Sequence, residues 1–206
     1  MRFVPIFLAA ALSAALSAAP HAARVGANSQ AAQAAQTGQA GGGAKSAATA
    51  AAAETRCDVW VYVLDPDPRG VNVRSGPGKQ FAAVAKLPHD EYSLMVHVTG
   101  ASGQWVRISE AERMESGDSV FKGAGWVYGP GLATQTKNYS GLDPEEPRVK
   151  LYREASKRSA VVLRLPNETE VNLTGCNGRW ARVRHKNVEG WLDPDSQCHS
   201  TLTTCS

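Results

Sequence analysis

The stretch Gly70-Val71-Asn72-Val73-Arg74-Ser75-Gly76-Pro77-Gly78 alternates apolar and polar residues and then runs into a Gly-Pro-Gly turn. A period of two is typical of a half-buried β-strand, and glycine and proline mark a turn. Further short apolar segments, each bounded by Gly, Pro or Asp, lie at residues 57–64, 81–87, 92–98, 105–108 and 125–128. Evenly spaced short strands with turn signals predict a small antiparallel barrel or sandwich.

The pattern recurs further along the chain, which indicates an internal repeat. At a constant offset of 78, Val71, Val73, Val84, Leu87 and Pro88 match Val149, Leu151, Val162, Leu165 and Pro166. The offset falls to 75 from Val96 to Arg107 and to 65 at Gly125-Trp126-Val127. These length changes lie between predicted strands, as expected for a duplicated fold.

The second copy differs in the turn, where Tyr152-Arg153-Glu154-Ala155-Ser156 replaces Arg74-Ser75-Gly76-Pro77-Gly78. If the glycines of the first turn supply positive φ angles, the second turn must bend differently. The second copy keeps the apolar residues of the predicted strands, so we expect it to have the same fold. Because the turn differs, we do not expect it to have the same binding role.

Three motifs together resemble the signature of the bacterial SH3 (SH3b) family: the opening nonapeptide, Gly103-Gln104-Trp105-Val106-Arg107-Ile108 and Gly125-Trp126-Val127-Tyr128. The resemblance implies an all-β chain with two small SH3-like antiparallel barrels in tandem. The predicted organisation is a signal peptide at 1–27, an Ala/Gln/Gly linker at 28–56, a first domain at 57–135, a linker at 136–148 and a second domain at 149–206.

The N-terminus predicts export. Arg2, an apolar run at 3–19 and small residues around 23–27 form a secretory signal peptide. Pro20 and Arg24 interrupt the apolar run before it could span a bilayer, and no cysteine follows it closely, so we expect no stable membrane anchor. Residues 28–55 lack the large apolar side chains that offset the entropy of ordering, which predicts a disordered tether. We therefore expect a periplasmic or secreted protein.

The chain has four cysteines, Cys57, Cys176, Cys198 and Cys205. An even number in an exported protein predicts two disulfides. We favour Cys57–Cys176, which ties the two domains together, with Cys198–Cys205 pinning the tail. The alternative pairs Cys176 with Cys198 or Cys205 inside the second domain. The spacing of Cys198 and Cys205 resembles no compact zinc motif, so we expect no metal.

Charge differs between the two predicted domains. Residues 57–135 hold seven Lys and Arg against nine Asp and Glu, a net charge of −2, whereas residues 149–192 hold nine against four, a net charge of +5. The basic domain can contact an anionic wall polymer or a membrane surface, dock on the acidic domain, or carry ordinary solvated charge. Nucleic-acid binding requires a denser basic stripe, so we do not expect it.

We expect no enzyme and no cofactor. No segment outside the two copies is long enough for a catalytic domain, and His89 and His97 lack a nucleophile at the spacing of wall peptidases. By the resemblance, peptide-groove candidates are the aromatic residues Trp60, Tyr62, Tyr92, Trp105, Trp126, Tyr128, Tyr152, Trp180 and Trp191. Trp105 and Trp126 can instead cover the core. Trp60 and Tyr62 share the strand face opposite Val59, Val61 and Val63, which predicts that they are exposed.

The predicted function is that of a non-catalytic binding or scaffolding module of the bacterial envelope, which recognises peptidoglycan peptides or a wall-associated protein. Two alternatives stay open. One is a structural or inhibitory protein-protein interaction partner in the periplasm, and the other is an accessory subunit of a wall hydrolase.

Overall fold

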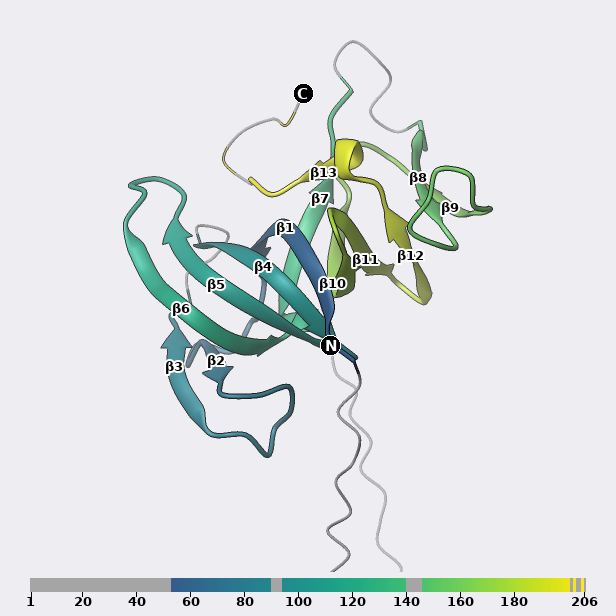
Figure 1. The fold of residues 1–206 in the computed structure, drawn as a ribbon. Helices are drawn as coiled ribbons and strands as arrows, with labels where there is room; N and C mark the ends of the chain where they lie inside the picture. Colours follow the sequence, from purple (N-terminus) through teal and green to yellow (C-terminus); the bar gives the residue numbers. More distant parts are fainter. Residues whose placement is uncertain (1–52, 90–93, 140–145, 201, 203–204, 206) are drawn as a thin grey trace, which may run out of the picture. The chain divides into compact units, whose positions relative to one another are not determined.

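The computed structural model describes residues 53–89, 94–139, 146–200, 202 and 205 (Figure 1). The predicted signal peptide, residues 28–52 of the predicted linker and Tyr92 lie outside these ranges. All described residues belong to one compact unit, Ala47–Ser206. A search of the described residues found no helix with the length and apolar character needed to cross a membrane.

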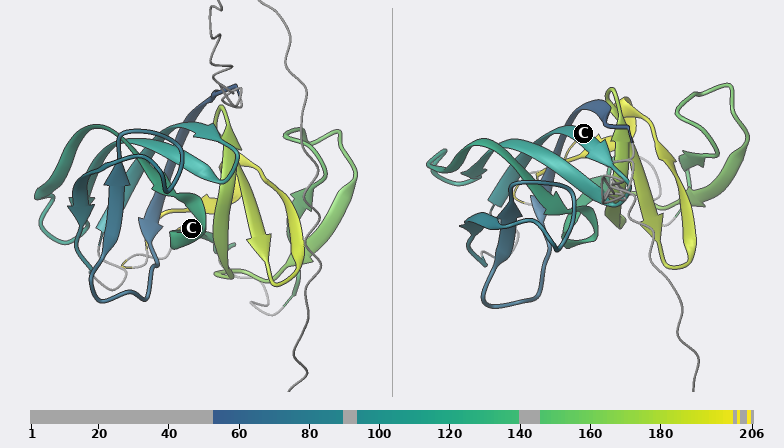
Figure 2. Two further views of the ribbon diagram at one scale, coloured as in Figure 1. Left: turned by 90° about the horizontal axis from the view of Figure 1, so that it is seen from below. Right: turned by 60° about the horizontal axis from the view of Figure 1, so that its bottom comes forward.

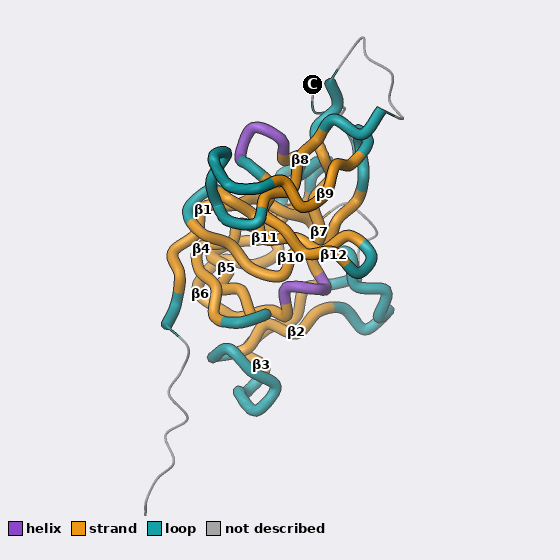
Figure 3. Tube along the Cα trace, turned by 90° about the vertical axis from the view of Figure 1, so that its right-hand side faces the viewer, coloured by secondary structure: helices purple, strands orange, loops and turns teal. Residues whose placement is uncertain are grey.

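The regular structure of the described part is β-strand, with two short 3-10 turns as its only helical elements (Figure 3). The elements are β1 (Thr55–Val63), β2 (Val71–Arg74), β3 (Ala83–Leu87), β4 (Leu94–Ser102), β5 (Trp105–Arg113), β6 (Ser119–Tyr128), the 3-10 turn η1 (Gly129–Gly131), β7 (Leu132–Thr136), β8 (Val149–Tyr152), β9 (Val161–Leu165), β10 (Glu170–Asn177), β11 (Trp180–His185), β12 (Val188–Leu192), η2 (Pro194–Ser196) and β13 (Gln197–Cys198). The first strand begins two residues before the predicted start at Cys57.

The strands form one large antiparallel sheet that does not close. Its order is β3-β2-β6-β5-β4-β1-β7-β10-β11-β12-β8-β9, and β13 pairs with β7. The all-β prediction is confirmed, whereas two separate closed barrels are not. Alternating burial supports the sheet: Val59, Val61 and Val63 of β1 are all buried, because successive side chains of a strand face opposite sides.

The two halves of the sheet have the same strand order. The pairings β2–β3, β2–β6, β4–β5 and β5–β6 recur as β8–β9, β8–β12, β10–β11 and β11–β12. We call residues 55–131 the first lobe and residues 149–198 the second lobe. Figure 2 shows the blue and teal strands of the first lobe beside the green and yellow strands of the second.

Strand β7 is common to both lobes. Ala133 pairs with Tyr62 of β1, and Thr134 pairs with Val171 of β10. At its other end, Gln135 pairs with Cys198 of β13. A single cluster of buried apolar residues includes members of both lobes. The predicted boundary at residue 135 therefore lies inside a strand that both lobes use.

The Gly-Pro-Gly turn and its counterpart follow the same backbone path. Three hydrogen bonds, Ser75 N to Ala82 O, Gly78 N to Gly76 O and Phe81 N to Gly78 O, recur 78 residues later from Arg153, Ser156 and Ser159. Neither Gly76 nor Gly78 is among the glycines with positive φ, so the predicted reason for a different second turn is wrong. Gly76 is required instead by close packing, because a Cβ there would lie 2.5 Å from the ring of Phe81.

The length differences lie where the sequence offsets place them. The ten extra residues of the first copy lengthen the β5–β6 hairpin relative to β11–β12. Glu110 and Glu112 are part of β5 and pair with Lys122 and Ser119 of β6. Glu115 and Asp118 lie in the exposed turn between the two strands.

Candidate functional site

A shallow groove of about 170 Å³ lies on the first lobe beside the opening nonapeptide. Its lining residues come from the β1–β2 loop, from β2 and the turn after it, and from β5 and β6; they are Asp65, Asp67, Gly70, Val71, Asn72, Arg74, Lys79, Trp105 and Tyr128. We call it the aromatic groove. Two of the nine predicted aromatic site residues, Trp105 and Tyr128, meet there.

The two rings of the aromatic groove are held together across the β5–β6 pair. Trp105 is the register partner of Tyr128, and their ring centroids are 5.5 Å apart at an interplanar angle of 56°. The Tyr128 hydroxyl donates to Gln104 Oε1 at 3.1 Å, which fixes the phenol. Tyr128 is 40% exposed. An exposed aromatic ring with an anchored polar tip is a contact surface that costs little conformational entropy on binding.

The β1–β2 loop forms the acidic wall of the groove. Asp65 Oδ1 accepts from Asp67 N at 2.9 Å, and Asp67 O accepts from Gly70 N at 2.8 Å. Hydrogen bonding and ion pairing with Arg69, at 2.8 Å, lower the pKa of Asp67 to about 2. Gly70 has φ of +77°, and a Cβ there would lie 2.1 Å from Leu87 O, so this position requires glycine.

The basic wall of the groove consists of Arg74 and Lys79. Arg74 Nη1 donates to Phe81 O at 2.8 Å and to Lys79 O at 3.2 Å. The Arg74 side chain is therefore committed to the carbonyls of the Gly-Pro-Gly turn and does not cover Trp105. The groove consequently presents an aromatic surface with carboxylates and an ammonium group in one place.

The second lobe has a groove of about 230 Å³ at the corresponding place, lined by Tyr139, Arg148, Val149, Lys150, Tyr152, Lys157, Asp193, Asp195 and Ser196. We call it the charged groove. Six of its members stand at positions equivalent to residues of the aromatic groove, with Tyr152 replacing Arg74, Lys157 replacing Lys79 and Asp193 replacing Tyr128. The two grooves are therefore the same feature of the fold with different side chains.

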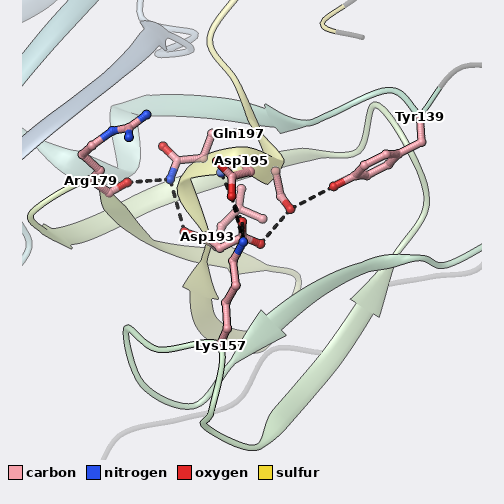
Figure 4. A network of polar contacts seen from close by, with 8 residues as sticks. Tyr139, Lys157, Arg179, Asp193, Asp195 and Gln197 are labelled. Atoms are coloured by element: carbon pink, nitrogen blue, oxygen red, sulfur yellow. Dashed lines mark hydrogen bonds and ion pairs between the residues drawn. The ribbon is translucent and has the colours of Figure 1, made fainter.

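Ion pairs and hydrogen bonds organise the charged groove (Figure 4). Lys157 Nζ lies 2.7 Å from Asp195 Oδ2 and 3.3 Å from Asp193 Oδ1. The buried Asp193 carboxylate also accepts from Asp195 N at 3.1 Å and from the Ser196 hydroxyl at 2.7 Å, so it caps the first turn of η2. The hydrogen bond to Lys157 lowers the pKa of Asp195, and the hydrogen bond to Asp195 raises the pKa of Lys157.

Trp180, the equivalent of Trp105 in the second lobe, packs against Tyr152 and does not line the charged groove. The two rings pack edge to face, with centroids 5.7 Å apart and an interplanar angle of 82°. Tyr152 is 7% exposed, and Trp180 does not line the charged groove. The predicted binding role of Trp180 therefore receives no support from a groove contact, whereas Trp105 lines the aromatic groove and the largely buried Tyr152 lines the charged groove.

Among the described residues, four further predicted aromatic residues line neither groove: Trp60, Tyr62, Trp126 and Trp191. Tyr62 is fully buried, and its hydroxyl donates to Glu170 Oε2 at 3.1 Å, so the prediction that it is exposed is wrong. Strand β1 lies between β4 and β7, and the second lobe covers the face that the alternation alone would leave to solvent.

Trp60 is half-buried against His97. Trp126 and Trp191 are half-buried on β6 and β12, and Tyr92 lies outside the described residues.

The structure pairs Cys57 with Cys176 and Cys198 with Cys205, the pairing that the sequence favoured. The first disulfide joins the two lobes across 119 residues of sequence. Disulfides persist mainly in oxidising compartments, so these bridges favour an extracytoplasmic location. Among the described residues no group of three or more His, Cys, Asp or Glu is arranged to hold a metal ion.

Sequence reasoning missed the polar members of the aromatic groove. No motif of the sequence assigns a binding role to Asp65, Asp67, Asn72 or Lys79. The available signal was their position, since each lies within seven residues of the nonapeptide that carries the family resemblance. The charged residues Lys157, Asp193 and Asp195 were missed because the second copy departs from that nonapeptide.

Comparisons with known proteins complete the description of the site. No curated protein matches the chain significantly. Two solved structures from Trichomonas vaginalis, NlpC2 and NlpC1, are each 14% identical to the chain, with TM-scores of 0.27 and 0.28. They cover 68% and 71% of this chain, which spans about half of theirs (47% and 48%). At these scores the likeness supports no argument. Residues 147–196, the second lobe from just before β8 to the end of η2, match the family model described as bacterial SH3 domain.

Proposed function

We propose that the protein is a non-catalytic binding module of the bacterial envelope and that its aromatic groove takes short peptides, those of peptidoglycan first among them. The observation that carries the proposal is the pair of the half-buried Trp105 and the exposed Tyr128 in a groove that also contains Asp65 and Lys79. SH3-type folds bind extended peptides in aromatic-lined grooves. The family match of the second lobe and the two disulfides support an envelope location.

The mixed charge of the aromatic groove favours a peptide over a purely apolar ligand. A short peptide carries amide donors and acceptors together with free amino and carboxyl groups. Asp65 can accept from an ammonium or amide, while Lys79 can pair with a carboxylate. Trp105 supplies flat apolar contact area, the type of side chain that most often dominates binding energy at an interface.

Cosedimentation with purified peptidoglycan sacculi tests the proposal. Trp105→Ala should weaken binding by about tenfold or more, because loss of a central aromatic contact costs about 1–2 kcal/mol or more. Trp180→Ala is the matched control at the equivalent position of the second lobe, where the indole packs against Tyr152 and does not line the charged groove, and it should bind as the wild type does. Equal binding by wild type and Trp105→Ala would overturn the role of the groove.

Crosslinking in intact cells separates the wall-peptide hypothesis from a protein partner. Adducts with sugar-peptide fragments support wall binding, while one recurrent protein adduct supports a structural or inhibitory partner. Release of muropeptides by the purified protein would contradict the non-catalytic assignment.

A further inference from the structure

A pocket of about 290 Å³ lies where the first strand of the first lobe meets the end of the second lobe. It is lined by Asp58, Val59 and Trp60 of β1, by Arg179 of the β10–β11 turn, and by Pro194, Gln197 and His199. We call it the junction pocket. None of its residues lines the aromatic groove or the charged groove.

The walls of the junction pocket are held in place before any ligand arrives. Cys57, next to Asp58, is bonded to Cys176, and Cys198, between Gln197 and His199, is bonded to Cys205. Backbone hydrogen bonds add to this, since Asp58 N donates to Gly178 O and Gly178 N donates to Arg56 O, each at 2.8 Å. A preorganised pocket loses less conformational entropy on binding.

His97 fixes both the aromatic ring and the carboxylate of the pocket. The His97 ring stacks on Trp60 with centroids 4.6 Å apart and an interplanar angle of 14°. His97 Nε2 lies 2.9 Å from Asp58 Oδ1, and His97 Nδ1 lies 3.0 Å from Ser109 Oγ. With both ring nitrogens engaged, the imidazole can neither rotate freely nor leave the indole, so the uncovered part of Trp60 keeps its position at the pocket.

Arg179 is the cation of the junction pocket. Its guanidinium makes no hydrogen bond or ion pair within the described part of the chain, and its charge only adds to the effect of Lys157 in lowering the pKa of Asp195. The main-chain carbonyl of Arg179 accepts from Gln197 Nε2 at 2.8 Å. Figure 4 shows the Arg179 side chain extending away from Asp193 and Asp195. A guanidinium binds a carboxylate through two parallel hydrogen bonds, so the position is suited to one acidic group of a ligand.

The remaining polar groups of the pocket add hydrogen-bonding capacity without adding positive charge. Burial lowers the pKa of His199, so its neutral form dominates at neutral pH and offers one donor and one acceptor. Gln197 Nε2 is engaged with the Arg179 and Leu192 carbonyls, which leaves its Oε1 to accept. Asp58 can accept through the carboxylate oxygen that His97 does not engage.

We propose that the junction pocket binds a sugar that carries a carboxylate. The C–H groups on one face of a pyranose ring pack against the negative face of an indole, Asp58, Gln197 and His199 match its hydroxyls, and Arg179 takes the carboxylate. The volume lies at the small end of ligand pockets, which suits a compact ring. This proposal is independent of peptide binding in the aromatic groove, because the two sites share no residue.

Ligand-observed NMR on the full chain tests the proposal with paired acidic and neutral sugars, glucuronic acid against glucose and N-acetylmuramic acid against N-acetylglucosamine. The acids should bind about tenfold more tightly than their neutral partners, which is the effect of one charge-assisted hydrogen-bonded pair. Arg179→Gln should remove this difference. Arg158→Gln, the same charge change at an exposed residue away from the pocket, should keep it.

Three outcomes would overturn the proposal: no detectable binding of either acid, equal binding of acids and neutral sugars, or unchanged acid binding by Arg179→Gln. Trp105→Ala separates the two sites. It should leave acid binding unchanged, and loss of acid binding in this variant would place the sugar in the aromatic groove instead. Because the readout uses free sugars, it does not depend on whether the protein binds sacculus peptides.

Discussion

The aromatic groove and the charged groove occupy the same place on two lobes with the same strand order. They differ in that Trp105 and Tyr128 line only the first, while a lysine paired with two aspartates organises the second. In the first lobe, Arg74 reaches the carbonyls of its own turn and leaves Trp105 in the groove. In the second lobe, Tyr152 stands at the equivalent position and packs against Trp180. One residue therefore decides whether a tryptophan that both lobes keep is part of the groove surface.

A second position reinforces the difference. Tyr128, the last residue of β6 and the register partner of Trp105, contributes an exposed ring, whereas Asp193 at the equivalent position is buried and caps η2. The η1 turn in the first lobe has no side-chain cap. The side chain that is free for ligand contact in one lobe thus stabilises the backbone in the other. Equivalent positions in two lobes with the same strand order can therefore serve different purposes, an exposed ring in one lobe and a helix cap in the other.

The largest expected effect comes from breaking the bridge between the lobes. The double variant Cys57→Ser, Cys176→Ser should lower the free energy of unfolding by about 2–5 kcal/mol, because the bridge closes a loop of more than a hundred residues in the unfolded chain. Cys198→Ser, Cys205→Ser removes a bridge across seven residues and should cost less. Denaturant unfolding of both variants measures the difference, and equal losses would contradict it.

The pattern of strands could be predicted from the sequence, and the connection between the lobes could not. Alternation and turn residues located most strands because these signals are local, and the repeat offsets placed the length changes correctly. The shared use of β7 was missed because pairing with both β1 and β10 is decided by long-range contacts. The same cause explains Tyr62, whose exposure the alternation predicts but whose surroundings include Glu170 of the second lobe.

The candidate site could be predicted in part. Trp105 and Tyr128 were singled out because the family resemblance points to aromatic groove residues, and the structure brings them together. Trp105 lines its groove and Trp180 does not. This difference could not be predicted from the sequence, because it depends on the contacts that the Arg74 and Tyr152 side chains make. The net charge of +5 over residues 149–192 is visible in the sequence, but the pairing of Lys157 with the two aspartates that follow this range is not.

Substitution at the position that separates the two grooves should affect the lobes unequally. Tyr152→Ala should cost about 3 kcal/mol, because it removes a buried aromatic ring and leaves a cavity beside Trp180. Arg74→Ala removes two hydrogen bonds at the surface and should cost about 1 kcal/mol. Thermal and denaturant unfolding give both values, and a larger cost for Arg74→Ala would reverse the comparison.

Substitution of Asp193, which caps η2, and of Tyr128 at the equivalent position should show a smaller difference in the free energy of unfolding. Asp193→Ala removes the acceptor for Asp195 N and the Ser196 hydroxyl and should cost about 1–2 kcal/mol. Tyr128→Ala, an exposed residue at the equivalent position, should change stability by no more than about 0.5 kcal/mol. Asp193→Asn keeps an acceptor for the cap and should recover part of the loss. A Tyr128→Ala variant as destabilised as Asp193→Ala would show that the ring holds the first lobe together.

The smallest effect concerns the acid titration of one carboxylate in each groove. Hydrogen bonding to Lys157 lowers the pKa of Asp195 below its ordinary value of 3.8, and hydrogen bonding to Arg69 lowers that of Asp67 to about 2. A lowered folded-state pKa means that each contact is fully present above pH 3.8 and is lost as the pH falls through the folded value. Both contacts should therefore persist at neutral pH and weaken only in strong acid.

Carboxyl carbon chemical shifts followed by NMR between pH 2 and pH 6 measure each titration separately. In Lys157→Ala the midpoint of Asp195 should rise toward 3.8 while that of Asp67 stays near 2, and in Arg69→Ala the reverse should hold. Asp195 is exposed and Asp67 is partly exposed, so the change in overall stability should be small because solvent screens such pairs. If the Asp195 midpoint does not move in Lys157→Ala, the ion pair does not organise the charged groove, and the difference between the grooves rests on Tyr152 and the Asp193 cap alone.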